Sequence, residues 1–246
     1  MNIMVYKFFQ KDNYEDFSSG RVISHKSKSP NFPVRLAGEI FCRCLEHINK
    51  TNNLCIYDPC CGSAYLLTVL GFLFNEKISA IYASDIEKEF ADFARNNLSL
   101  LSINGLEKRK NNLMELIKKY NKQSHIAALN SLNRISEYIK HEIKADIFIT
   151  DILNKNSLGN KMFCSDIVIT DVPYGSLVTW SDKTNDPINI LLDTIIPIIN
   201  KNTIIAIIHN RNQKISNAQY NRADKFKAGH RVVEIMRLKD YPEEIL

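Results

Sequence analysis

Leu54-Cys55-Ile56-Tyr57-Asp58-Pro59-Cys60-Cys61-Gly62-Ser63 is the stretch that decides the fold of this 246-residue chain. An apolar run ends in an acid, and a proline and a glycine then precede a helical pattern. This order is typical of a buried strand that turns directly into a helix. Ligands of parallel α/β sheets lie at the carboxyl ends of the strands, so the turn at 58–63 predicts one wall of a binding cleft.

A second segment of the same kind is Asp166-Ile167-Val168-Ile169-Thr170, which is followed by Asp171-Val172-Pro173-Tyr174-Gly175. It places an acid, a proline and an aromatic ring after another buried strand. Because the carboxyl ends of parallel strands meet along one edge, both turns are expected to face one cleft. A simple turn explains the acid, the proline and the glycine, but it does not explain the aromatic ring of Tyr174.

The rest of the chain alternates strands and helices, which predicts a doubly wound α/β sheet. The predicted helices cover 33–48, 63–75, 87–101 and 186–200, and the predicted strands cover 54–58, 80–85, 146–151, 166–172, 203–208 and 232–238. We expect one domain over residues 1–246. Its first 50 residues form an extension and a helix, and residues 105–145 form an inserted helical hairpin.

Composition is that of an ordinary globular protein, with 45% hydrophobic and 24% charged residues. No apolar run approaches the roughly 20 residues of a membrane span, and no signal-peptide pattern is present, so we expect a cytoplasmic monomer. The net charge is +5. Residues 107–144 carry nine Lys or Arg against four acids, and residues 201–231 carry seven against one. Such clusters favour a polyanion, so RNA or DNA is the expected partner.

The turn at 58–63 suits the amino-acid end of S-adenosylmethionine. The first N–H groups of the following helix favour a carboxylate, Asp58 can hold an ammonium group, and Gly62 allows close approach. Asp85 is placed to accept the ribose hydroxyls and Asp151 the adenine amino group, although either acid alone could instead cap a helix. A nicotinamide or flavin is disfavoured because G-x-G-x-x-G is absent. The residues predicted to bind the cofactor are Asp58, Pro59, Cys60, Gly62, Ser63, Asp85, Asp151 and Asp171.

The segment 171–175 suits methyl transfer to a nitrogen of a nucleobase, a reaction that depends on positioning. Asp171 can accept the hydrogen bond of the reacting N–H, and the backbone carbonyl of Val172 or Pro173 is a second acceptor. Tyr174 offers a face on which an extruded base can stack. Asp171, Pro173 and Tyr174 are therefore the predicted catalytic residues. Trp180 fits a substrate contact and a core position equally well.

The cysteines bear on an alternative mechanism, in which a thiolate attacks a pyrimidine. Cys60 and Cys61 lie in the cofactor turn, and the segment 171–175 contains no cysteine. Cys42 and Cys44 would point to different faces of one helix, which makes a poor zinc site. We therefore expect neither a covalent thiolate mechanism nor a metal.

Five segments carry a more specific likeness. They are 32–41, 58–71, 83–85, 97–102 and 170–175. They resemble the avilamycin-resistance rRNA methyltransferase family, AviRa, and the resemblance runs from about Tyr14 to the final strand. It implies a Rossmann-like class I methyltransferase that methylates N1 of a guanine in large-subunit rRNA and so protects ribosomes from orthosomycin antibiotics. Ala64 departs from a family glycine, and the region after His209 and the insertion match in pattern only.

The sequence thus predicts an enzyme, an S-adenosylmethionine-dependent rRNA guanine methyltransferase. The predicted RNA contacts are Arg35, Trp180, Lys108, Arg109, Lys110, Arg211 and Lys214. One alternative is an enzyme for an exocyclic amine, guanine N2 or adenine N6 in RNA or DNA, since such sites commonly read Asp-Pro-Pro-Tyr where this chain has Val172. Another is a non-catalytic RNA-binding protein of the same fold, against which the acids at the strand ends argue.

Overall fold

The computed structural model describes residues 6–17, 20–24, 32–173, 180 and 184–239. Its seven-stranded sheet has the order β3-β2-β1-β4-β5-β7-β6. The strands are β1 (Leu54–Asp58), β2 (Ile78–Asp85), β3 (Lys144–Ile149), β4 (Ile167–Asp171), β5 (Ile204–Asn210), β6 (Tyr220–Ala228) and β7 (Arg231–Leu238). β1 to β5 are parallel, and β7 pairs antiparallel with β5 and β6. The chain returns from β3 to β4 beside β1, so the topological switch point lies between β1 and β4.

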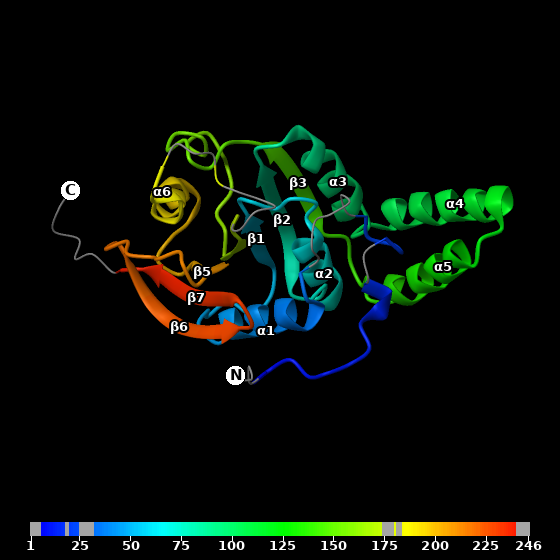
Figure 1. Cartoon of the computed structure of the whole chain (residues 1–246), viewed down its shortest axis with the longest axis horizontal. Coiled ribbons are helices and arrows are strands. Elements are labelled where there is room, and N and C mark those ends of the chain that lie inside the picture. Colours follow the sequence, from blue (N-terminus) through cyan, green and yellow to red (C-terminus); the bar gives the residue numbers. More distant parts are fainter. Residues whose placement is uncertain (1–5, 18–19, 25–31, 174–179, 181–183, 240–246) are drawn as a thin grey trace.

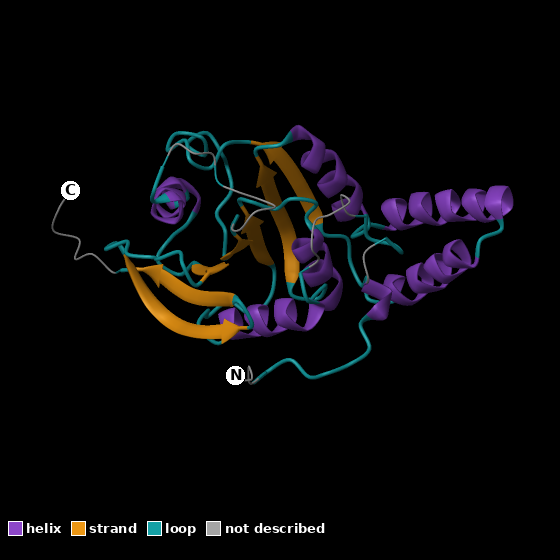
Figure 2. Ribbon diagram, in the orientation of Figure 1, coloured by secondary structure: helices purple, strands orange, loops and turns teal. Residues whose placement is uncertain are grey.

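The helices cover both faces of this sheet. They are α1 (Val34–Leu45), α2 (Tyr65–Leu73), α3 (Lys88–Ser99), α4 (Ile103–Tyr120), α5 (Gln123–Ser136) and α6 (Pro187–Thr194), with short 3-10 turns η1 (Glu15–Phe17) and η2 (Ile196–Ile198). α1, α2 and α3 pack on one face and α6 on the other, while α4 and α5 project from the body as a hairpin (Figures 1 and 2). No helix in the described ranges is long and apolar enough to cross a membrane.

Two apolar clusters fill the space between the sheet and the helices. Ile56 and Ile169 belong to the cluster under α1, α2 and α3, whereas their neighbours Tyr57 and Val168 belong to the cluster under α6. Side chains alternate along a strand, so every second residue of β1 and β4 faces the same helices. Near-continuous apolar strands are therefore buried on both faces, as the sequence predicts for a doubly wound sheet.

The described residues before α1 (6–17, 20–24 and 32–33), which we call the lead-in, are held against α1 by Glu39. This fully buried carboxylate accepts the backbone N–H groups of Lys7, Phe8 and Phe9, each at 2.9 Å, and the Nε–H of Arg43 at 2.8 Å. Burial alone would raise the pKa of Glu39, but these hydrogen bonds outweigh it and leave the pKa below its ordinary value. The lead-in is thus irregular in shape yet fixed in place.

The predicted elements are confirmed except at three places. β6 (Tyr220–Ala228) was not predicted, because most of its residues are polar and exposed at the sheet edge, which leaves no apolar pattern. The predicted strand 146–151 is wrong by two residues, since β3 ends at Ile149 and leaves Asp151 in the following turn. The predicted helix 186–200 is wrong after Thr194, where η2 with its Pro197 replaces the α-helix.

Candidate active site

Three acids meet at the carboxyl edge of the sheet. Asp58, Asp85 and Asp171 are the last residues of β1, β2 and β4, and β1 lies between the other two strands. Asp58 and Asp171 each follow an isoleucine of the α1–α3 cluster by two positions, Ile56 and Ile169. The two carboxylates therefore face the same side of the sheet.

Asp58 is the most buried of these acids, with 2% of its surface exposed. Its Oδ1 accepts the backbone N–H of Cys60 at 2.9 Å. Burial, together with the smaller effect of the charges of Asp85 and Asp171, raises the pKa of Asp58 to about 7, although hydrogen bonds act in the opposite direction. A buried carboxyl group beside two other acids favours a cationic ligand, because a cation would stabilise its charged form.

The turn after β1 is shaped by residues with positive φ. Gly62 has φ +52°, and the position that a Cβ would occupy there has no heavy atom within 4 Å. Ala64 has φ +54° and directly precedes α2. The left-handed region costs a residue with a Cβ about 1–2 kcal/mol, which gives a physical reason for glycine at the matching family position. The backbone of Gly62 therefore borders open space rather than packed side chains.

Asp85 holds this turn and borders an apolar surface. Its Oδ2 accepts the Gly62 N–H at 2.8 Å and its Oδ1 the Glu87 N–H at 3.0 Å, and burial raises its pKa. The next residue, Ile86, is 55% exposed, and Ile149, which pairs with Asp85, is 52% exposed. Exposed isoleucines beside an acid suit a flat ring. Neither isoleucine was predicted as a site residue, although the apolar residue directly after Asp85 is a signal visible in the sequence.

Asp151 lies in the turn after β3. Its Oδ1 accepts the N–H of Leu153 at 2.9 Å, which closes an Asx turn. No helix begins between Asp151 and β4, so the helix-capping alternative for Asp151 is wrong. Its charge also raises the pKa of Cys60, which puts it within electrostatic reach of the turn after β1. Cys60 and Cys61 both have pKa values well above the usual range, chiefly because they are buried, so their thiols stay protonated.

The substrate side begins at Asp171, the last residue of β4. The Nε of Arg231 lies 3.7 Å from its Oδ2, and this guanidinium stabilises the negative charge of the carboxylate. The carbonyl of Pro173 accepts the Nε2–H of Gln213 at 3.1 Å. Arg231 was not among the predicted site residues. It is the first residue of β7, which pairs antiparallel with β5, and only this pairing brings its side chain within reach of Asp171 on β4. Tyr174 and Gly175 lie outside the described residues.

The predicted RNA-binding arginines make contacts within the chain. Arg35 donates to the carbonyl of Phe9 at 3.2 Å and lies over the ring of Tyr6. Arg109 donates to the carbonyl of Arg21 at 2.9 Å, and burial lowers its pKa. Each of these two arginines therefore holds the lead-in.

The other predicted RNA contacts are exposed, except for Trp180. Arg211 is exposed and donates to the carbonyl of Gly229 at 2.7 Å. Lys108, Lys110 and Lys214 are exposed. Trp180 is partly buried against the α6 cluster, which favours the core position over the substrate contact.

Asn97 on α3 links the lead-in to the turn after β1. It is 1% exposed, its Nδ2 donates to the carbonyls of Ser63 and Ser24 at 2.8 Å, and its Oδ1 accepts the Ser24 N–H at 2.8 Å. Asn97 was not among the predicted site residues. The signal was an amide on the helix face that also carries Ala94 and Leu98, where a buried polar group needs partners.

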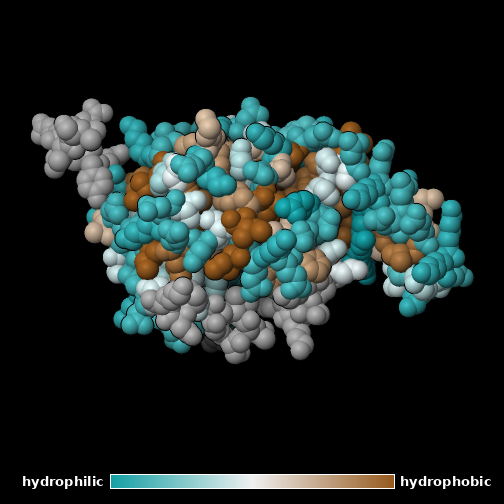
Figure 3. All heavy atoms as spheres, turned by 90° about the horizontal axis from the view of Figure 1, so that it is seen from above, coloured by the Kyte–Doolittle hydropathy of each residue, from teal (hydrophilic) through white to brown (hydrophobic). Residues whose placement is uncertain are grey.

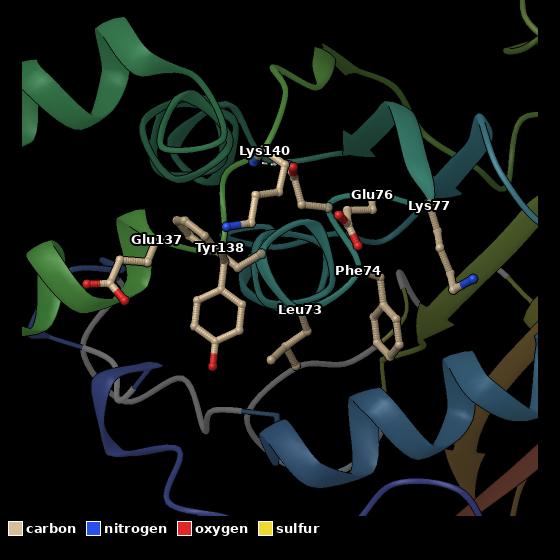
Figure 4. Close-up of a pocket in the computed structure, with 9 residues that line it drawn as sticks. Leu73, Phe74, Glu76, Lys77, Glu137, Tyr138 and Lys140 are labelled. Carbon is tan, nitrogen blue, oxygen red and sulfur yellow. Dashed lines mark hydrogen bonds between the residues drawn. The ribbon is translucent and has the colours of Figure 1, made fainter.

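A hollow of about 450 Å³ lies elsewhere, between the end of α2 and the segment after α5. In Figure 4 the side chains of Leu73, Phe74 and Tyr138 point the same way around it, with Glu76 and Lys77 at one side. These residues directly precede β2 or follow α5, so the hollow lies at the amino edge of the sheet. It is separate from the three acids. Among the described residues, no group of His, Cys, Asp or Glu could hold a metal ion.

A seven-stranded sheet with one antiparallel return, a glycine turn after β1 and acids closing β1, β2 and β4 defines a Rossmann-like methyltransferase. The family model described as rRNA methyltransferase AviRa matches residues 4–231. The chain belongs to the AviRa family.

Its relatives agree in sequence and in structure. The chain is 32% identical over 234 residues to the 23S rRNA (guanine(2535)-N(1))-methyltransferase of Streptomyces viridochromogenes, covering 93% of each. The rRNA methyltransferase aviRa of that organism matches in structure with a TM-score of 0.82 and 30% identity, over 93% of this chain and 94% of that one. A Haemophilus influenzae structure described as a methylase gives 0.50 at 11% identity, over 89% and 98%, which shows the shared fold alone.

Proposed function

We propose that this chain transfers a methyl group from S-adenosylmethionine to N1 of a guanine in large-subunit rRNA. The observation that carries the proposal is the meeting of Asp58, Asp85 and Asp171 at one sheet edge. The proposal is also supported by the Streptomyces relative, whose name specifies N1 of a guanine in 23S rRNA. Methyl transfer requires that the bound cofactor lie next to the residue that holds the nucleobase, and this arrangement of the three acids would allow it.

The cofactor supplies an electrophilic methyl group, and the residues around the β1 turn fit its other parts. Asp58 holds the ammonium group, and the N–H groups at the start of α2 hold the carboxylate. Asp85 accepts the ribose hydroxyls. Ile86 and Ile149 border the adenine ring, with Asp151 near its amino group. The burial of the Asp58 carboxyl beside two other acids, with its raised pKa, is the strongest support for a cationic ligand here.

At the substrate side, Asp171 accepts the hydrogen bond of guanine N1–H and takes its proton as N1 gains the methyl group. Arg231 stabilises the carboxylate that does so. Gln213 fixes the carbonyl of Pro173, a second acceptor at the base. Val172 donates its N–H to Ile208 at 3.0 Å, a bond that a proline at this position could not make. We expect Tyr174 to stack on the base.

We infer further that the chain works as one methyltransferase domain, as a monomer in the cytoplasm, where ribosomes are found. The packing of the lead-in on α1 and on the α4–α5 hairpin supports one domain. Protection against orthosomycins is a proposal that follows from the family. It is tested by comparing the inhibitory concentration for a susceptible host with and without the gene.

Label transfer tests the proposal. Purified protein is incubated with methyl-labelled S-adenosylmethionine and unmodified 23S rRNA, and label in the RNA is the expected result. If the protein binds the cofactor but transfers no label, the alternative of a non-catalytic RNA-binding protein is supported instead. Reverse transcription separates the atoms, because a methyl group on guanine N1 blocks pairing and arrests extension. Labelled RNA that is read through would indicate an exocyclic amine.

A further inference from the structure

The α4–α5 hairpin is a fixed arm that ends far from the three acids. α4 has 18 residues, so it is about 27 Å long, and it projects from the body at the right of Figure 1. Leu113, Ala128 and Leu132 are buried between or beneath its helices. At the root, Asp16 accepts the Nε–H of Arg134 at 2.7 Å. The packing and this ion pair hold the arm in one direction.

The tip of this arm gathers positive charge, and we define it as Lys118, Lys119, Tyr120, Lys122 and His125. The three lysines are exposed, and Tyr120 is 49% exposed. The Nζ atoms of Lys119 and Lys122 lie 5.1 and 5.8 Å from the centre of the Tyr120 ring. One ring face of this kind attracts ammonium groups. Asn121, with φ +45°, makes the turn that brings residues of both helices together.

The charge at the tip exceeds what the helices themselves require. Lys118 and Lys119 lie in the last turn of α4, where cations stabilise the helix dipole. Lys122 is the residue before α5, where a cation is unfavourable, and the first turn of α5 has no acid to offset it. Across the described part of the chain, none of the three lysines takes part in an ion pair. Figure 3 shows the arm as mostly hydrophilic surface.

We propose that this tip binds phosphates of a segment of ribosomal RNA other than the one that holds the target guanine. The inference rests on the proposed function. Positive charge without acidic partners is complementary to a phosphate backbone. The length of the arm places this contact well away from the acids that receive the base. A short RNA that occupies the cleft therefore leaves the tip free, whereas a folded rRNA reaches both.

The test compares two RNAs and two matched variants. The tip variant is Lys118→Gln/Lys119→Gln/Lys122→Gln. The control is Lys11→Gln/Lys50→Gln/Lys155→Gln, which removes the same charge at exposed lysines outside both basic regions. For the tip variant, we expect kcat/KM on full-length 23S rRNA to fall about tenfold and the salt dependence of binding to become shallower. Activity on a short stem-loop that contains the target should stay the same. The control should match the wild type on both RNAs, and a triple Lys→Arg variant of the tip should restore activity.

Equal rates of the tip variant and the wild type on full-length rRNA would overturn the proposal. So would an equal loss on both RNAs, since that places the contact on the target segment itself. Filter binding of both RNAs is measured in parallel, so the tip is judged even if no methyl transfer occurs. Failure of methyl transfer by the wild type would count against the proposed function and not against the tip.

Discussion

The backbone N–H of Gly62 donates a hydrogen bond to Oδ2 of Asp85, 2.8 Å away, and so joins the turn after β1 to the acid that closes β2. The other oxygen of Asp85 accepts the N–H of Glu87. This one carboxylate therefore shapes the turn that we propose holds the methionine part of the cofactor, and it also faces the place proposed for the ribose.

Replacement of Asp85 by Asn should weaken cofactor binding. The amide keeps one acceptor but loses the charge and one of the two acceptor positions, so the dissociation constant for S-adenosylmethionine should rise about 10- to 100-fold. Titration calorimetry measures it. Asp92→Asn, an exposed acid on α3, is the control and should bind as the wild type does. Unchanged affinity in Asp85→Asn would contradict the assignment.

The pH dependence of binding should report Asp58. Its pKa of about 7 means that the carboxyl is largely neutral at pH 5.5 and gains charge as the pH rises. Affinity for the cationic cofactor should therefore increase from pH 5.5 to 7.5, below the pKa of the ligand amino group at about 7.7–8.0. In Asp58→Asn this increase should disappear. A flat profile in the wild type would show that Asp58 does not meet the cation.

The same shift predicts an opposite effect on stability. The pKa of Asp58 in the folded chain lies above its ordinary value of 3.8, so its contribution favours folding at low pH and is lost as the pH rises through about 7. Asp58→Asn should therefore be more stable than the wild type at pH 8, in the absence of ligand, while binding the cofactor less well. Urea unfolding at pH 5 and pH 8 measures the difference. A variant that is less stable at pH 8 would contradict this sign.

Asn97 should matter for the cofactor although it lies outside the cleft. Asn97→Ala removes three hydrogen bonds and leaves the Ser63 carbonyl without its donor, which should cost about 1–3 kcal/mol of stability and weaken cofactor binding. Asn96→Ala, the exposed neighbour on the same helix, is the matched control. Equal behaviour of the two variants in thermal unfolding and in calorimetry would remove Asn97 from this account.

The predicted basic contacts should separate into two groups. Arg109→Ala should destabilise the chain, since it removes the donor to the Arg21 carbonyl, and should leave RNA affinity nearly unchanged. Lys108→Ala should leave stability unchanged because this side chain is exposed. Unfolding curves and filter binding on the same proteins give both values. RNA binding that is weakened by Arg109→Ala at unchanged stability would reverse the assignment.

Sequence patterns predict the centre of this fold better than its edges. β1 and β4 are apolar on both faces and end in acids, so their runs locate both walls of the cleft. β3 is exposed over Lys144 to Asp146, so its apolar pattern is weak and its end was predicted two residues late. Asp151 was therefore expected at the end of the strand but lies after it. Asn97 and Arg231 were not predicted as site residues because their partners, Ser63 and Asp171, are far away in the sequence. The side chain of Arg109 is directed toward the lead-in because of the face that α4 packs against it. The number of basic residues in the region does not predict which face that is.

The central claim is tested most directly by mass spectrometry of nucleosides from 23S rRNA after incubation with S-adenosylmethionine and the protein. The account predicts one 1-methylguanosine per rRNA with the wild type. It predicts none with Asp171→Ala, whose affinity for the cofactor should stay within a few-fold of the wild type. A methyl group on an exocyclic amine, no modified nucleoside at all, or full activity of Asp171→Ala would contradict it.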